Sequence, residues 1–155
     1  MEKGEKFVLK AFNLSPFEIV LHSLTAERFN RTIENVLFQI QGGKVRVKIL
    51  DVFHFGIYNF GAKQVPFIVQ DYAGGPVVNK TLDSSTPILA IDIHSIFKEL
   101  SKKKYTLDPF PSNWRRSLVD EDVIEYIDLI FSGDEAVKEA SRDLIKSKEW
   151  MMLEI

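Results

Sequence analysis

Hydrophobic and polar residues alternate most regularly over residues 44–49. Valine or isoleucine occupies every second position of this segment, and Arg46 and Lys48 lie between them. A two-residue period is typical of a β-strand with one buried face. Further short β-rich segments, separated by turns that contain glycine, continue to residue 82. We therefore predict an antiparallel β meander over residues 44–82, and a separate short strand at residues 5–12.

A helical pattern precedes this meander. Ser15, Pro16 and Glu18 form a typical helix start, because serine caps free N–H groups, proline suits the first helical position and the glutamate can close a capping box. Apolar residues then recur at helical spacing up to Ile40. We predict one long helix, or two short ones, ending at the glycine pair 42–43.

The second half of the chain predicts a mixture of elements. The apolar run at residues 88–93 predicts a central strand, and residues 94–104 predict a short helix whose lysine-rich end suits the helix dipole. Two prolines predict an irregular segment over residues 105–117. Apolar residues on a wide face predict a helix over residues 120–131, and residues 134–148 predict another.

This order of elements predicts an α+β fold. The chain of 155 residues is 45 % hydrophobic, which is ample for one core, so we predict a single domain over residues 1–155. In it an antiparallel β meander, barrel-like and partly open, is packed by the N-terminal helix and the C-terminal helices.

Composition narrows the classes of function. The absence of cysteine excludes a disulfide scaffold, thiolate zinc sites and a cysteine nucleophile. The first residues do not resemble a signal peptide, and no apolar run reaches the roughly 20 residues that cross a bilayer. We therefore expect a soluble, cytoplasmic protein with no membrane partner, and no cofactor is predicted.

The charge is nearly balanced but unevenly distributed. A formal net charge of −2 argues against a general nucleic-acid binder, because such domains usually carry a basic excess. Basic residues nevertheless crowd residues 98–116, and acidic residues dominate residues 120–135. A basic patch can therefore lie beside an acidic one.

Aromatic residues are concentrated in the meander and alternate with basic ones. The rings are Phe53, Phe55, Tyr58, Phe60, Phe67 and Tyr72. Bases of single-stranded nucleic acid stack on rings presented by a sheet, while nearby lysine and arginine hold the phosphates. The alternative is that these rings form the core. The two-residue period puts Phe53 and Phe55 on one face and His54, Gly56 and Tyr58 on the other, so only one set can be buried.

One part of the meander also has a family resemblance. Residues 45–78 contain a strand, a bend with glycine and a second strand that ends in Gln70, Asp71, Tyr72, Ala73 and Gly74. This arrangement resembles the opening of an oligonucleotide-binding barrel. The resemblance implies a barrel-like sheet and a nucleic-acid ligand.

The proline-rich segment offers a second contact patch, formed by Trp114, Arg115 and Arg116. Tryptophan and arginine are enriched where partners bind, and arginine can grip phosphate with two hydrogen bonds. The alternative is that the tryptophan pins the segment to the core. Our first hypothesis is therefore a non-enzymatic binding module for single-stranded nucleic acid. Its candidate residues are Arg46, Lys48, Phe55, Tyr58, Lys63, Trp114, Arg115 and Arg116.

Two further hypotheses use other parts of the chain. The terminal segment EWMMLEI is too apolar for a free tail, so the C-terminal helices and this tail could form a protein–protein interface or a homodimer. Asp92 and His94, two apart on a predicted strand, could bind a divalent metal in a hydrolase or nuclease. The alternative is that Asp92 caps the following helix and His94 lies in its first turn.

Overall fold

The structure is a computed structural model, and it describes residues 6–78, 88–120, 122–128 and 135–147. A single 3₁₀ turn at Pro111–Asn113 precedes β6. In chain order the described elements are β1 (Phe7–Ala11), α1 (Pro16–Ile33), β2 (Phe38–Ile40), β3 (Gly43–Ile49), β4 (Val52–Phe60), β5 (Lys63–Asp71), α2 (Ala90–Lys102), β6 (Trp114–Arg116), β7 (Val123–Tyr126) and α3 (Glu135–Ser147).

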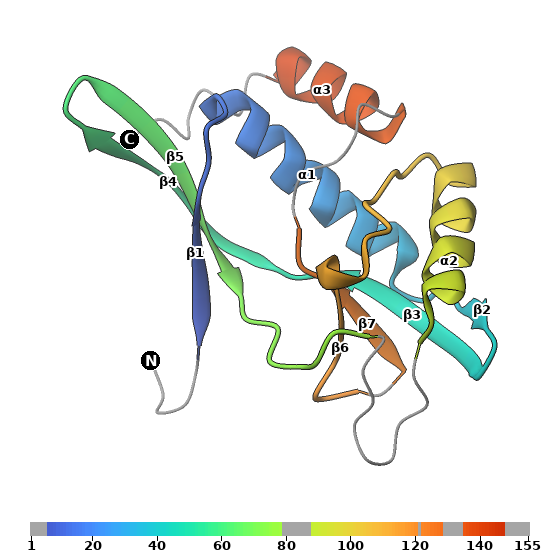
Figure 1. Cartoon of the computed structure of the whole chain (residues 1–155). Coiled ribbons are helices and arrows are strands. Elements are labelled where there is room, and N and C mark those ends of the chain that lie inside the picture. The colour runs from blue at the N-terminus through green and yellow to red at the C-terminus, as the bar shows by residue number, and fades with distance from the viewer. Residues whose placement is uncertain (1–5, 79–87, 121, 129–134, 148–155) are drawn as a thin grey trace.

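The described strands form two open sheets, which confirms the α+β class (Figure 1). One is a three-stranded antiparallel sheet in the order β1-β5-β4. The other has the order β2-β3-β7-β6, and its β3–β7 pair is parallel. The β4–β5 hairpin belongs to the predicted meander. Because the consecutive strands β3 and β4 belong to different sheets, the described strands form neither a continuous meander nor a closed barrel.

The first helix begins as predicted and ends earlier. The backbone N–H of Glu18 donates to the hydroxyl oxygen of Ser15 at 3.2 Å, so the predicted cap is present. The helix runs without a break to Ile33. Its predicted extension to Ile40 is wrong, because residues 38–40 form β2 and pair with β3. The glycine pair serves the β2–β3 turn, where Gly43 has a φ of +140° that disfavours other residues.

Two other predicted elements are wrong in type. The apolar run at residues 88–93 leads into α2, where Ile93, Ile96 and Leu100 are buried at helical spacing. The predicted helix over residues 120–131 contains β7, which inserts between β3 and β6. Short apolar runs are compatible with either a buried strand or a buried helix. Pairing with the distant strand β3 and with β6 decided the second case.

The main core lies between the four-stranded sheet and the helices. Val47, Ile49, Ile124 and Tyr126 point inward from adjacent strands and are buried. Figure 1 shows α1 and α2 beside this sheet and α3 alongside α1. The apolar side of α3 is buried, as is typical of an amphipathic helix. The helices thus leave the three-stranded sheet only partly covered.

Two predicted features lie wholly or partly outside the described residues. The apolar tail, within residues 148–155, lies outside the described residues, as does the end of the meander beyond Val78. Just before that end, Val77 forms an isolated bridge with Arg115 of β6. Among the helices of the described ranges, none has the length and apolar character needed to cross a membrane.

Candidate binding surface

The two faces of the three-stranded sheet differ in coverage. Residues directly opposite each other on neighbouring strands share a face. On one face, Ile68 is fully buried, and its β4 partner Phe55 packs against the core. The opposite face carries the residues that alternate with these along each strand, such as Phe67 of β5 and Tyr58 of β4. No helix of the described ranges covers that second face, which we call the ring face.

The ring face exposes large apolar side chains. Phe60 is 69 % and Tyr58 is 59 % exposed. Their ring centroids lie 6.3 Å apart. Phe7 of β1 and Phe53 of β4 are also exposed and contact each other edge to face, with centroids 5.3 Å apart. Several neighbouring rings are thus available to a ligand on one side of a short sheet.

A depression of about 450 Å³ lies within the ring face. Its lining consists of Leu9, Ala11, Tyr58, Phe60, Val65 and Phe67. The Phe67 ring lies across Gly56, where an added Cβ would be 2.5 Å from a ring carbon. Glycine is therefore needed at that position for the ring to lie against the strand. The apolar lining suits a flat or aliphatic group and gives little hydrogen-bond selectivity.

Two lysines accompany these rings. Lys63 is exposed and lies directly opposite Phe60 at the end of the β4–β5 hairpin. The turn between them contains Gly61, whose φ of +61° suits a tight hairpin turn. At the other end, the Nζ of Lys6 lies 5.4 Å from the centroid of the Tyr72 ring, a cation–π contact. The ring face is therefore apolar at its centre, with a lysine at each of two borders and the Asp71 carboxylate opposite Phe7 at the second.

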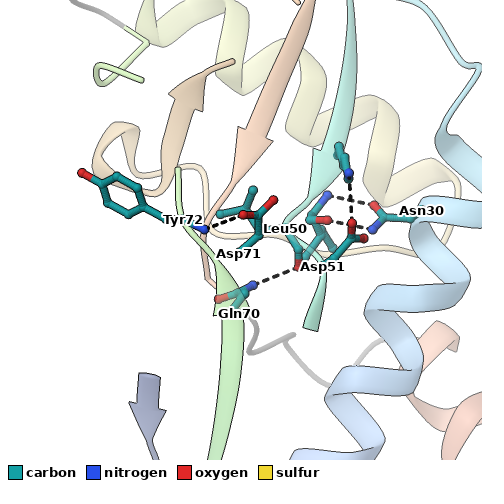
Figure 2. Close-up of polar contacts among 8 residues, drawn as sticks. Asn30, Leu50, Asp51, Gln70, Asp71 and Tyr72 are labelled. Atoms are coloured by element: carbon teal, nitrogen blue, oxygen red, sulfur yellow. Dashed lines mark hydrogen bonds and ion pairs between the residues drawn. The ribbon is translucent and has the colours of Figure 1, made fainter. Parts of the chain in front are cut away.

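Side chain to backbone hydrogen bonds fix the junction between the two sheets (Figure 2). Asn30 of α1 bonds both backbone groups of Ile49: its Nδ2 donates to the carbonyl at 2.7 Å, and its Oδ1 accepts from the N–H at 2.8 Å. Gln70 of β5 donates to the carbonyl of Leu50 at 3.1 Å. These contacts hold the bend where β3 leads into β4, and hence the orientation of the ring face.

The strand β1 is attached to the second sheet as well. The Nζ of Lys10 donates to the carbonyl of Ile127, just after β7. Burial lowers the pKa of Lys10, and the nearby Asp128 carboxylate opposes this effect. The Lys10 ammonium group therefore has a structural role. It lies on the covered side of β1 and does not belong to the ring face.

Three predicted basic residues lie on the outer face of the four-stranded sheet, and each has an acidic neighbour. Arg46 forms an ion pair with Asp120 at 2.6 Å, and Lys48 forms one with Asp51 at 3.2 Å. Arg115 lies opposite Glu125 in the β6–β7 pair. Of the predicted basic residues, Lys63 therefore lies on the ring face, whereas Arg46, Lys48 and Arg115 lie on the other sheet.

Two acidic residues, Glu125 and Asp71, help to neutralise the basic residues of this outer face. Burial raises the pKa of Glu125, and the Asp71 carboxylate raises it further, while Lys48 opposes both effects. The outer face of the four-stranded sheet therefore has mixed charge rather than a basic excess. Such a surface attracts phosphate groups less than isolated lysines do.

The remaining predicted residues are covered. Trp114 is completely buried, its Nε1 donates to the carbonyl of Asp108 at 2.8 Å, and its ring centroid is 5.0 Å from that of Tyr126. Arg116 is buried beside it. Trp114 thus pins the proline-rich segment to the core, which is the alternative considered from sequence. Of the eight candidate residues, the structure brings Tyr58 and Lys63 together on the ring face.

The predicted metal pair is separated by helical geometry. Asp92 and His94 lie in the first turns of α2, where residues two apart point in different directions. Both carboxylate oxygens of Asp92 accept backbone N–H groups at 3.0 Å, from Leu89 and Gln41. Within the described ranges, no group of three or more acidic or histidine side chains could hold a metal ion.

Sequence reasoning missed Phe7 and Leu9 of β1. Both project onto the ring face because β1 pairs with β5, which lies about sixty residues later in the chain. The alternation of Phe7, Leu9 and Ala11 with Val8 and Lys10 was a usable signal for a strand with two different faces. It could not indicate which neighbouring strand would place these side chains beside Tyr58.

Comparisons with protein-family models, with curated proteins and with solved structures found no match for this chain. The geometry of the ring face is therefore the main indication of function.

Proposed function

We propose that the protein is a non-enzymatic binding module that holds single-stranded nucleic acid on the ring face. The observation that carries this proposal is the set of exposed rings on the uncovered side of the β1-β5-β4 sheet. Each base stacked on such a ring contributes on the order of 1–3 kcal/mol. Tyr58 and Phe60 are the two most exposed aromatic side chains of this face and are its central contacts.

The charges and the depression specify the mode of binding. Lys63 and Lys6 border the rings and can each contact a phosphate. The lining of the depression offers few polar groups to read base edges. Binding should therefore be weak, independent of sequence and selective for unpaired bases, because paired bases keep their flat faces inside the duplex.

Fluorescence anisotropy with a labelled oligothymidine tests this proposal. Phe60→Ala and Tyr58→Ala should each weaken binding by about 5- to 150-fold, the equivalent of 1–3 kcal/mol. Phe110→Ala is the matched control, since this exposed ring lies in the proline-rich segment, and its affinity should not change. Two phosphate contacts predict a slope of about −1.4 for the logarithm of affinity against that of salt concentration.

Three results would count against nucleic-acid binding. These are no association at tens of micromolar protein in low salt, equal affinity for a duplex of the same length, and equal affinity of the wild-type and ring variants. Sedimentation of the free protein tests the competing occupant of the ring face, a second copy of the chain. A dimer that Phe60→Ala converts to monomer would favour self-association instead.

A further inference from the structure

Three pairs of rings, all from described residues, follow one another along β4 on the ring face. In strand order the pairs are Phe7 with Phe53, His54 with Phe67, and Tyr58 with Phe60. Their ring centroids lie 5.3, 5.9 and 6.3 Å apart, respectively. The first pair is open to a ligand like the last, because Phe7 is 44 % and Phe53 is 55 % exposed. We call this series, from Phe53 to Phe60, the ring row.

A β-bulge brings Phe53 into the ring row. Strict alternation would put Phe53 on the same face as Phe55, which packs against the core. The pairing of β4 with β5 instead shifts by one residue between Val52 and His54. Such a bulge redirects a side chain, and the Phe53 ring contacts Phe7, which belongs to the ring face. The ring row therefore extends to the beginning of β4.

Each end of the ring row has a lysine, but the two ends differ in charge. Lys63 lies at the hairpin end, opposite Phe60. At the other end, Lys6 precedes Phe7, and Asp71 lies opposite Phe7 on β5. The Asp71 carboxylate reduces the attraction of that end for a phosphate group. The hairpin end is therefore the stronger contact, and the end at the beginning of β4 is the weaker one.

The length of the ring row sets the size of the ligand. The row is roughly 23 Å long from Phe53 to Phe60, at about 3.3 Å per strand residue. A stacked strand advances about 3.4 Å per nucleotide, so about eight stacked nucleotides, or fewer in an extended strand, span the row. We propose that the ligand is an oligonucleotide long enough to contact both ends of the ring row, an inference that rests on the proposed nucleic-acid binding. A dinucleotide occupies one end at a time and binds weakly.

Fluorescence anisotropy with two labelled ligands tests this proposal, a thymidine dinucleotide and an oligothymidine of about ten nucleotides, which exceeds the ring row. Linked contacts raise affinity through a high effective concentration, so the full-length protein should bind the long strand more tightly by a factor of roughly ten or more.

The decisive variant combines Phe7→Ala with Phe53→Ala, which removes the weaker end. Its affinity for the long strand should fall by about 5-fold or more. Its affinity for the dinucleotide should change by less than about 2-fold, because the dinucleotide binds mainly at the hairpin end. Phe110→Ala is the matched control, since this exposed ring lies outside the ring row, and its affinity for either ligand should not change. Phe53→Tyr keeps a ring in place and should bind the long strand like the wild type.

Three results would overturn this inference and leave the proposed function in place, provided that Phe60→Ala still weakens binding of the long strand. An unchanged affinity of the Phe7→Ala, Phe53→Ala variant for the long strand would mean that the weaker end makes no contact. Equal losses for both ligands would mean that one short site binds them. A loss in Phe53→Tyr as large as in the alanine variant would mean that packing, not stacking, was disturbed. If the wild type binds neither ligand, the proposed function fails together with this inference.

Discussion

The two sheets of this protein use similar side chains in opposite ways. In the four-stranded sheet, Trp114 and Tyr126 lie under the helices, and their polar atoms bond within the protein. In the three-stranded sheet, Tyr58 and Phe60 are exposed on the ring face. The comparison shows that aromatic content does not indicate function by itself. The layer of helices decides which rings stabilise the core and which can meet a ligand.

Removing one ring from each sheet should give the largest contrast. Trp114→Ala should lower the free energy of unfolding by about 3–5 kcal/mol, because it leaves a cavity in a fully packed core. Phe60→Ala should change it by no more than about 0.5 kcal/mol, since the ring is exposed. Urea denaturation monitored by circular dichroism measures both values. Similar losses in the two variants would contradict the distinction between the sheets.

Removing one hydroxyl from each sheet should give a smaller contrast. The oxygen of Tyr126 accepts the N–H of Asp108 at 2.9 Å, and burial raises the pKa of Tyr126. Tyr126→Phe leaves that N–H without its acceptor and should cost about 1 kcal/mol. Tyr58→Phe should have almost no effect on stability, because its hydroxyl is on the exposed ring face. Thermal melts of the two variants provide the test, and a larger loss in Tyr58→Phe would refute it.

The smallest effect concerns the acidic pair at the border between the sheets. Because the pKa of Glu125 is raised in the folded protein, the folded state binds a proton more readily than the unfolded state does. This contribution to stability is complete below the usual pKa of 4.5 and declines as the pH rises through the raised value.

Glu125→Gln should therefore flatten the dependence of stability on pH above 4.5. It should also make the protein slightly more stable at pH 7, by less than about 0.5 kcal/mol, because the group is half exposed and solvent screens its charge. Melting temperatures measured across this range provide the test. A steeper pH dependence in the variant would reverse the assigned sign.

Local signals predicted several elements correctly. The Ser15 cap located the start of α1, Gly61 located the β4–β5 turn, and the helix predicted over residues 134–148 corresponds to α3. Each of these features depends on residues that are close in sequence. The error at residues 123–126 has the opposite origin, because this short segment pairs with the distant strand β3. Residues 38–40 pair with β3 across a tight turn, but both segments could equally have been helical by pattern.

The binding surface was predictable only in part. The sequence indicated that more rings lie along the meander than one face can bury, and Tyr58 and Lys63 do lie together on the ring face. It could not separate them from Trp114, which has the same chemical character and is enclosed. The addition of Phe7 and Leu9 depended on the pairing of β1 with β5.

The order of residues thus specified the caps, the turns and the two-faced strands, because these follow from the backbone preferences and alternation of neighbouring residues. Which face of each strand would be covered followed from contacts between distant segments. α1 and α2 cover one side of the four-stranded sheet, whereas the ring face has no helical layer among the described residues. Burial is a property of the assembled layers, so the same aromatic side chain became core in one sheet and surface in the other.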